Sequence, residues 1–258
     1  MTDQPETLSQ QRFGKFAEAY VTSITHGQGI WLARLLELAW PQPDWAVLDV
    51  ATGGGHTALT FAPHVARVTA SDITPAMLQA AEKNLTEKGA ANVDFRLANA
   101  EGLPFDDASF DLVTCRIAPH HFDDVTQFVR EAARVLRHTG TLLVQDIVMP
   151  EDTATAGIVE AFEKLRDPSH NRALTETQWR AAFADAGLMV THVEEVVKVS
   201  DFAAWTARQE VTPSTKACLE ALVSQASLEV LAWMQPTNWG TDEATFTCHY
   251  VIAQGVKE

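Results

Sequence analysis

The amino-acid sequence predicts an α/β fold in which a parallel β-sheet carries helices on both faces. Short β-forming runs alternate with helical stretches along the chain, which is typical of βαβ units. Helix start and stop residues fall between these runs, so the two signals agree. The runs that predict the parallel strands are residues 46–51, 65–71, 93–98, 112–115 and 141–146.

The first predicted element is an N-terminal helix. Residues 13–40 are amphipathic, and Phe16, Tyr20 and Ile24 follow one another at intervals of four residues. Side chains at this spacing lie on one face of a helix, so these three are expected to pack against the rest of the protein. The first strand of the sheet, at residues 46–51, follows this helix.

Two helices in the middle of the chain carry recognisable start signals. Thr74 is a suitable N-cap, Pro75 fits the first helical position, and Gly89 is placed to end the same helix. Thr175 and Gln178 have the spacing of a capping box, in which each side chain bonds the other residue's backbone N–H. Both helices therefore have defined beginnings.

The last part of the chain predicts two more strands with a helical insertion between them. Residues 189–197 and 244–253 have the composition of strands. The long separation at residues 200–242 carries tryptophans and leucines at roughly helical spacing. We interpret this separation as a helical cover inserted before the last strand.

The composition limits the classes of function. The chain has 258 residues, with 19 Lys and Arg against 34 Asp and Glu, a net charge of −15. So negative a protein repels phosphate backbones, which disfavours a nucleic-acid substrate. No run approaches the roughly 20 apolar residues of a membrane span, and the first ten residues show no leader peptide, so we expect a cytoplasmic protein. The three cysteines (Cys115, Cys218 and Cys248) lack metal-ligand spacing, and no metal is expected.

The turn after the first predicted strand has the composition of a nucleotide-binding loop. Residues 47–56 form a hydrophobic strand that breaks into three consecutive glycines before a helix. Glycines let a ligand approach the backbone closely, and a helix N-terminus offers unpaired N–H groups. Gly53, Gly55 and Ala58 also satisfy the dinucleotide pattern GxGxxG/A, with Asp72 able to bind ribose hydroxyls. A nicotinamide cofactor therefore competes with other nucleoside-bearing ligands.

Five ordered motifs resemble those of class I S-adenosylmethionine (SAM) dependent methyltransferases, close to the group that includes ubiquinone/menaquinone C-methyltransferases. The similarity covers most of residues 10–190. It implies a Rossmann-like, seven-stranded, mostly parallel sheet with helices on both faces, an antiparallel last strand and a helical cover. The motifs lie at residues 47–56, 72–78, 99–105, 109–113 and 134–137.

The resemblance implies which residues hold the methionine and ribose portions of SAM. The positions of Asp49, Ala51, Gly53 and Gly55 correspond to the methionine cradle. The acidic residue that matches Asp72 accepts both ribose hydroxyls in such enzymes. Ala51 departs from the pattern, since many relatives have glycine there, and its methyl group adds bulk near the ligand.

The resemblance also places residues around the adenine. Ile73 and Met77 would flank the ring, and the backbone N–H of Ala100 would reach a ring nitrogen. Asn99 stands where relatives usually have Asp, and its amide oxygen can still accept from the adenine amino group without a charge. Glu101 and Arg116 complete the predicted cofactor-binding set.

The methyl acceptor is expected beside the loop that follows the fourth strand. In open α/β sheets, ligands bind outside the carboxyl ends of the strands. Residues 115–122 form this loop and supply Arg116 and the adjacent pair His120 and His121, either of which could act as a base near neutral pH. His170 matches a region that closes over the substrate in similar enzymes. All three histidines are candidate catalytic residues, although each could instead be structural.

The leading hypothesis is a SAM-dependent methyltransferase that acts on an oxygen, nitrogen or carbon atom of a small, partly apolar metabolite. One alternative is a short-chain-type NAD(P)-dependent oxidoreductase, but neither Tyr20 nor Tyr250 has the Lys four residues later that such an enzyme needs. Another is a SAM-binding protein without catalysis. We expect a possible homodimer and a single domain with three parts: a helical cap at 1–40, a SAM-binding core at 41–150 and a C-terminal part at 151–258.

Overall fold

The centre of the sheet is a strand of apolar residues that is covered on both sides. The structure is a computed structural model that describes residues 7, 8, 10–15 and 30–258. All five residues of β1 (Ala46–Val50) are buried. A strand buried on both faces reads as a near-continuous apolar run in a parallel sheet, which is why 46–51 was recognisable in the sequence.

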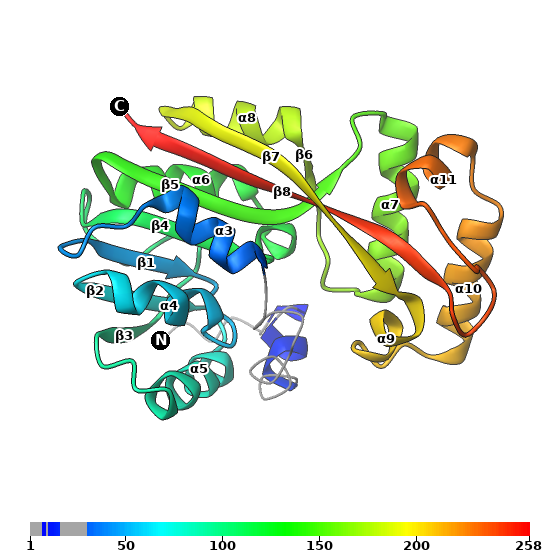
Figure 1. The fold of residues 1–258 in the computed structure, drawn as a ribbon, viewed down its shortest axis with the longest axis horizontal. Helices are drawn as coiled ribbons and strands as arrows, with labels where there is room; N and C mark the ends of the chain where they lie inside the picture. The colour runs from blue at the N-terminus through cyan, green and yellow to red at the C-terminus, as the bar shows by residue number, and fades with distance from the viewer. Residues whose placement is uncertain (1–6, 9, 16–29) are drawn as a thin grey trace.

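The sheet has the strand order β3-β2-β1-β4-β5-β8-β7 (Figure 1). The strands β1 to β5 run parallel, and β8 runs antiparallel to both of its neighbours, β5 and β7. This confirms the predicted mostly parallel sheet with an antiparallel last strand. Besides β1, the strands are β2 (Arg67–Asp72), β3 (Val93–Leu97), β4 (Phe110–Arg116), β5 (Leu136–Met149), β7 (Leu188–Asp201), β8 (Thr245–Lys257) and the short β6 (Leu174–Thr175), which pairs with β5.

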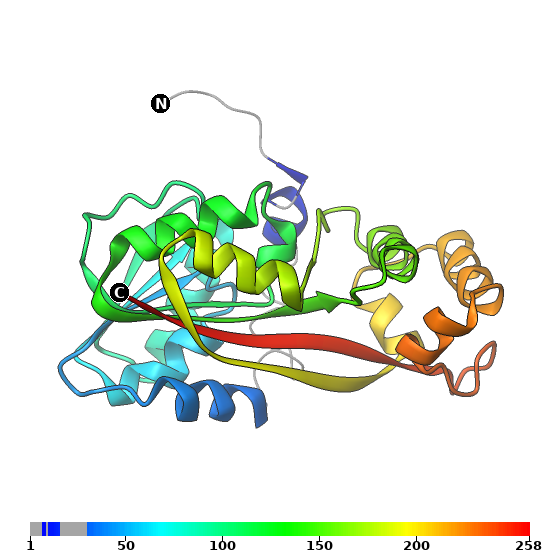
Figure 2. The same ribbon diagram turned by 90° about the horizontal axis from the view of Figure 1, so that it is seen from above.

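Helices cover both faces of this sheet, as Figure 2 shows. Apolar side chains of α3, α4 and α5 pack on one face, and those of α6 and α8 pack on the other. The helices in this layer are α3 (Ile30–Ala39), α4 (His56–Phe61), α5 (Pro75–Glu87), α6 (Val125–Val135) and α8 (Glu176–Asp185). Two short 3₁₀ turns, η1 (Ala62–His64) and η2 (Pro119–His121), lie in the loops.

A helical cover packs on the far ends of the long strands. It consists of α7 (Thr153–Arg166), α9 (Phe202–Ala207), α10 (Pro213–Ser224) and α11 (Leu228–Met234). Its apolar core includes Phe162, Trp205 and Phe246, so β8 extends from the sheet into the cover (Figure 1). The predicted helical insertion before the last strand is thus present.

The strands of this region are longer than the sequence indicated. The predicted strand 141–146 is part of the 14-residue β5, and 189–197 is part of the 14-residue β7. Their ends are polar or point into the cover, so the alternation that marks a strand in the sequence is lost there.

The predicted helix signals have mixed outcomes. The capping box of Thr175 and Gln178 is formed. Thr74 occupies the N-cap of α5, but its side chain makes no cap hydrogen bond. The predicted N-terminal helix is present over α3, whereas Phe16, Tyr20 and Ile24 lie outside the described residues.

Among the described residues, no single helix is both long and apolar enough to cross a membrane. Taken together as a bent pair, α10 and α11 pass that test by length and composition alone.

Candidate active site

Two cavities open beside the carboxyl ends of the parallel strands. The first, which we name the turn cavity, is bordered by the β1–α4 turn, the end of β2 and the loop after β4. The second, the aromatic cavity, lies between η2, α7, α9, β7 and β8. Ile117 and His121 line both cavities, so the two meet at the loop after β4. The predicted cofactor residues that line the turn cavity are Ala51, Gly53, Asp72, Ile73, Met77, Asn99, Ala100, Glu101 and Arg116.

Asp72 is held at the edge of the turn cavity by the backbone. Its Oδ2 accepts from the Gly53 N–H at 3.0 Å, and its Oδ1 accepts from the Thr74 N–H at 2.9 Å. Burial raises the pKa of this carboxyl group, and the two backbone donors oppose that rise. Each carboxylate oxygen can accept more than one hydrogen bond, so Asp72 retains acceptor capacity toward the cavity.

The backbone of the β1–α4 turn leaves open space above it. Gly53 has a φ of 54°, and a Cβ added there would meet no heavy atom within 4 Å. Ala51 adopts the left-handed region as well, with a φ of 53°, although it carries a side chain. A non-glycine residue in this region is strained, and such strain concentrates at functional sites.

Asp49 and Gly55 do not line the turn cavity. The Asp49 carboxylate accepts hydrogen bonds from Thr52 Oγ1 at 2.6 Å and Thr114 Oγ1 at 2.8 Å, and burial raises its pKa to about 6. At Gly55, with a φ of 82°, an added Cβ would overlap Leu85 Cδ1 of α5. Both residues therefore shape the turn from behind, and we do not assign them a direct ligand contact.

Two loop residues organise the part of the turn cavity where the sequence predicts the adenine. Asn99 Oδ1 accepts from the Glu101 N–H at 3.0 Å, and this oxygen can accept a second hydrogen bond. Glu101 Oε1 accepts from the N–H groups of Asp123 and Asp124, at 2.7 and 3.0 Å. Glu101 thus ties the loop after β3 to the loop after η2.

Arg116 lies at the boundary of the turn cavity and the sheet. Its Nε donates to Thr57 Oγ1 at 3.2 Å. Burial lowers the pKa of its guanidinium to about 10, and the nearby Asp49 opposes this change. Arg116 therefore stays charged at neutral pH beside the turn.

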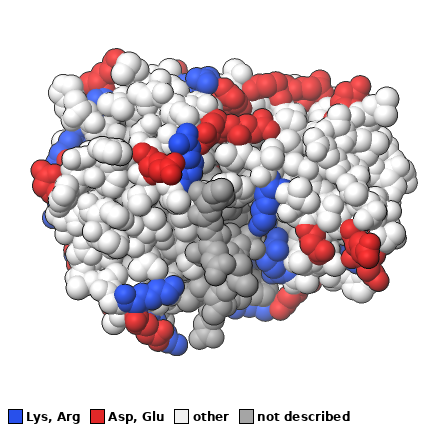
Figure 3. Space-filling model, in the orientation of Figure 1, with Lys and Arg blue, Asp and Glu red and all other residues white. Residues whose placement is uncertain are grey.

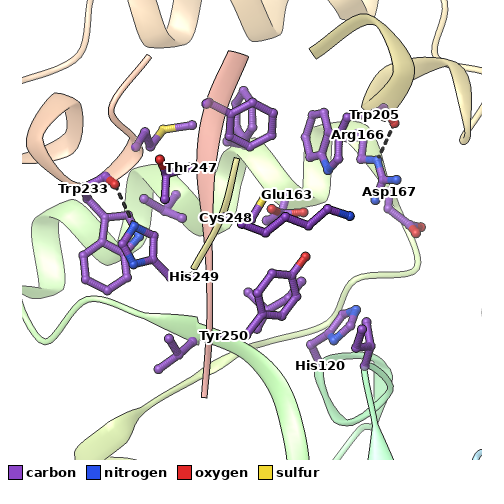
Figure 4. Close-up of a pocket in the computed structure, with 18 of the residues that line it drawn as sticks. His120, Glu163, Arg166, Asp167, Trp205, Trp233, Thr247, Cys248, His249 and Tyr250 are labelled. Carbon is purple, nitrogen blue, oxygen red and sulfur yellow. Dashed lines mark hydrogen bonds between the residues drawn. The ribbon is translucent and has the colours of Figure 1, made fainter. Parts of the chain in front are cut away.

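His120 forms a buried pair with Asp146, which is the last predicted residue of the fifth strand. His120 Nδ1 lies 2.6 Å from Asp146 Oδ1, and both side chains are almost fully buried. Burial raises the pKa of Asp146 to about 7 and lowers that of His120 well below 6.5, so near neutral pH the imidazole is uncharged and carries one ring proton. When this proton is on Nδ1, the lone pair of the His120 imidazole is on Nε2. His120 lines the aromatic cavity (Figure 4).

The other two predicted histidines lie beside this pair. His121 Nδ1 donates to the Ser169 carbonyl at 2.9 Å, because a carbonyl oxygen can only accept. Its ring centroid lies 4.1 Å from that of His120. The His170 ring lies tilted against that of His120, with the ring centroids 5.1 Å apart. Its Nε2 is 3.0 Å from Glu160 Oε1, and His170 lines neither cavity. Among the described residues, no group of His, Cys, Asp and Glu is placed to hold a metal ion.

Sequence reasoning missed most of the aromatic cavity. Asp146 could have been found, because it ends a predicted parallel strand at the edge where ligands bind. No sequence motif contains the cavity residues Tyr250, Lys198 and Arg208. They come together only because β7 pairs with β8 and α9 packs beside them. The hydroxyl of Tyr250 points into the cavity, on the side where Cys248 and Glu163 lie (Figure 4).

Comparisons with known proteins agree with this geometry. The sequence profile of the methyltransferase domain family matches residues 48–144. The chain is 34% identical over 246 residues to the uncharacterized methyltransferase YcgJ of Bacillus subtilis, covering 95% of this chain and 97% of that protein. The crystal structure of YcgJ superimposes with a TM-score of 0.85 over 88% of this chain and 97% of that one.

A second relative covers less of the chain. The ubiquinone/menaquinone biosynthesis C-methyltransferase UbiE of Shewanella sediminis is 32% identical over 151 residues, which are 57% of this chain and 60% of that protein. This similarity omits much of the chain, so it leaves the acceptor open.

Proposed function

Because the chain belongs to the class I SAM-dependent methyltransferase family, we propose that it binds SAM in the turn cavity and methylates a small, partly apolar metabolite in the aromatic cavity. The observation that carries this proposal is the meeting of the two cavities at Ile117 and His121. A donor in one cavity and an acceptor in the other would approach each other there. The nicotinamide alternative is not retained, since the relatives reported above are methyltransferases.

The turn cavity has the chemistry that SAM requires. Asp72 is an acidic acceptor at a strand end, suited to the two ribose hydroxyls, and the open space above Gly53 admits a ligand close to the backbone. Ile73 and Met77 provide apolar surface for the adenine, with Asn99 beside them. When bound, SAM supplies a methyl group on a positively charged sulfur, which needs little further activation.

The residues of the chain then have two tasks, to position the acceptor and to remove a proton. Holding two reactants in line accounts for a large part of the rate of a bimolecular transfer. The aromatic walls of the second cavity would exclude water and orient the acceptor, with Tyr250 as a polar contact. Where the acceptor atom carries a proton, His120 Nε2 would take it, and Asp146 would stabilise the resulting imidazolium.

The test is a search for methylated products in mixtures of candidate acceptors. Purified protein is incubated with SAM and extracts of small metabolites, and mass spectrometry follows S-adenosylhomocysteine (SAH) and new compounds heavier by one CH₂ group. We expect stoichiometric SAH and product from at least one acceptor. Absence of SAM and SAH binding by calorimetry would contradict the proposal. Tight SAH binding with no product from any acceptor would instead favour the non-catalytic SAM-binding alternative.

A further inference from the structure

The aromatic cavity gathers basic side chains in a protein that is strongly acidic overall. Lys198 of β7, Arg208 just after α9 and Arg166 at the end of α7 all line it. The chain has only 19 Lys and Arg residues against 34 Asp and Glu. On the face shown in Figure 3, Lys and Arg occur only in small groups, so a cavity lined by three cations is a distinct feature.

Lys198 faces this cavity without a counter-charge. Burial lowers the pKa of the Lys198 ammonium, Arg208 lowers it further, and Cys248 opposes this change. Among the described residues, no carboxylate lies within ion-pair distance of the Lys198 ammonium. Two cations on different elements therefore repel each other across a partly desolvated space, and an anion between them would relieve this repulsion.

The two carboxylates of the cavity are engaged elsewhere. Asp167 is 3.3 Å from Arg12 Nε and accepts from Gln209 Nε2 at 2.9 Å. Glu163 is buried, which raises its pKa, and its charged neighbour of opposite sign is Arg166. Neither carboxylate forms an ion pair with Lys198, so the positive charge of Lys198 faces the cavity.

The third cation, Arg166, packs against the aromatic wall of the cavity. The Arg166 guanidinium lies 4.6 Å above the Trp205 ring, and its Nε donates to the Trp205 carbonyl at 3.2 Å (Figure 4). It stabilises the aromatic wall and stands beside Glu163. The other two cations that line the cavity are Lys198 and Arg208, and its apolar wall consists of Trp205, Phe162 and Phe246.

We propose that the methyl acceptor is an acid, with an apolar or aromatic body held by these rings and a carboxylate or phosphate group held between Lys198 and Arg208. This inference rests on the proposed function, since it names the substrate class of the same site. The charged end of the acceptor lies at the Lys198 side of the cavity, and the methylated atom lies at the His120 and His121 side, where the turn cavity begins.

The test compares probes of matched shape that differ in charge. Calorimetry in the presence of SAH measures the binding of 2-naphthoate, 2-naphthyl phosphate and the neutral 2-naphthamide to the full chain. At least one anionic probe is expected to bind about tenfold more tightly than the amide. Which of the two anions binds more tightly distinguishes a carboxylate acceptor from a phosphorylated one.

Variants assign the preference to Lys198. Lys198→Met should reduce the preference to about twofold or less, Lys198→Arg should retain it, and raised salt should weaken only the anionic probes. Lys83→Met is the matched control, because Lys83 is exposed on α5 and lines neither cavity, yet its loss changes the net charge equally.

Two results would overturn the inference. One is a wild-type protein that binds neither anion more tightly than the amide, including one that binds none of the probes. The other is a folded Lys198→Met variant that keeps the full preference. If Lys198→Met does not fold, the probe preference of the wild-type protein and its salt dependence still test the inference. SAH binding in the same samples separates the hypotheses, since intact SAH binding without anion preference contradicts only the acidic acceptor.

Discussion

Asp72 is fixed by two backbone N–H donors and still faces the turn cavity, so its carboxylate is oriented before any ligand arrives. Asp72→Asn replaces one acceptor oxygen by a donor while keeping the shape of the side chain. We expect SAH binding to weaken by about 2 kcal/mol, because hydrogen bonds to a charged group are lost. Isothermal calorimetry measures this change.

The matched control for Asp72 is Asp94→Asn on β3, where the side chain is exposed and lines neither cavity. Its SAH affinity should equal that of the wild type. An Asp72→Asn protein that is folded and binds SAH within twofold of the wild type would remove the assigned role.

From the pairing of Asp146 with His120, we predict a variant that loses turnover and keeps its cofactor affinity. Asp146→Asn removes the carboxylate that accepts the hydrogen bond from His120 Nδ1–H. The imidazole tautomer with its lone pair on Nε2 is therefore less favoured. With an acceptor that loses a proton, kcat should fall by about 100-fold, while SAH affinity stays unchanged. Since burial raises the pKa of Asp146 to about 7, the wild-type rate should fall as the pH drops below about 7 and this carboxylate takes up a proton.

The control is Asp185→Asn, an exposed residue at the end of α8. Unaltered turnover in the Asp146→Asn protein would mean that the pair is structural.

Asp49 gives a prediction for the pH dependence of stability. Burial raises its pKa from 3.8 to about 6. A carboxyl group whose pKa is raised on folding contributes stability below its unfolded value, and that contribution is lost as the pH rises through the folded value. Asp49→Asn removes this group, so its stability relative to wild type should improve between pH 4 and about pH 7, by up to about 3 kcal/mol. Urea unfolding at both ends of this range measures it, and a difference independent of pH would contradict the prediction.

At the residue scale, the sequence was informative wherever a strand end fixed a position. Asp72 ends β2, and Gly53 lies in the turn after the neighbouring β1. The contact between them could therefore be expected from the register of a parallel sheet. His120 and Asp146 are 26 positions apart and meet only because η2 packs beside β5. No sequence motif predicts this contact. The role of Gly55 could not be read either, since it depends on Leu85 of α5.

At the scale of elements, the β1–α4 turn is held against α5. Gly55→Ala should destabilise the protein by about 2 to 4 kcal/mol, because a left-handed φ and an overlap with Leu85 act together. Gly89→Ala is the control, since Gly89 has a φ of 76° with nothing within 4 Å of an added Cβ, and should cost only about 1 kcal/mol. Thermal and urea unfolding give both values.

Rescue makes this prediction more stringent. Leu85→Ala in the Gly55→Ala background removes the overlapping atom, so the penalty of Gly55→Ala should shrink when it is measured against Leu85→Ala alone. Equal costs for Gly55→Ala and Gly89→Ala would show that only the backbone conformation matters at position 55.

The predicted elements were most reliable in the core of the sheet. β1 and β3 were predicted to within one residue, because their ends coincide with turns. β5 and β7 extend beyond their predicted limits toward α7 and α9, where they pack on the cover, and β8 extends at residues 254–257, where it pairs with β5 and β7. Local composition carries no signal for these tertiary contacts.

At the scale of the whole molecule, the sheet and the helical cover border different cavities. The parallel half of the sheet ends in the turn cavity, and the long antiparallel strands carry the aromatic cavity outward to the cover (Figure 1). The described N-terminal residues join the two parts. Gln10 Nε2 donates to the Ile73 carbonyl at 3.2 Å, and Arg12 Nη2 donates to Gln209 Oε1 at 2.8 Å. Thr7 and Phe13 of this segment line the turn cavity, and Gln209, which Arg12 contacts, lines the aromatic cavity.

The most direct test of the central claim is a crystal structure of the protein with SAH. We predict that the ribose hydroxyls contact Asp72, the adenine lies between Ile73 and Met77, and the sulfur faces Ile117 and His121, toward the aromatic cavity. SAH bound elsewhere, or bound with its sulfur turned away from the aromatic cavity, would contradict the claim that donor and acceptor meet where the two cavities join.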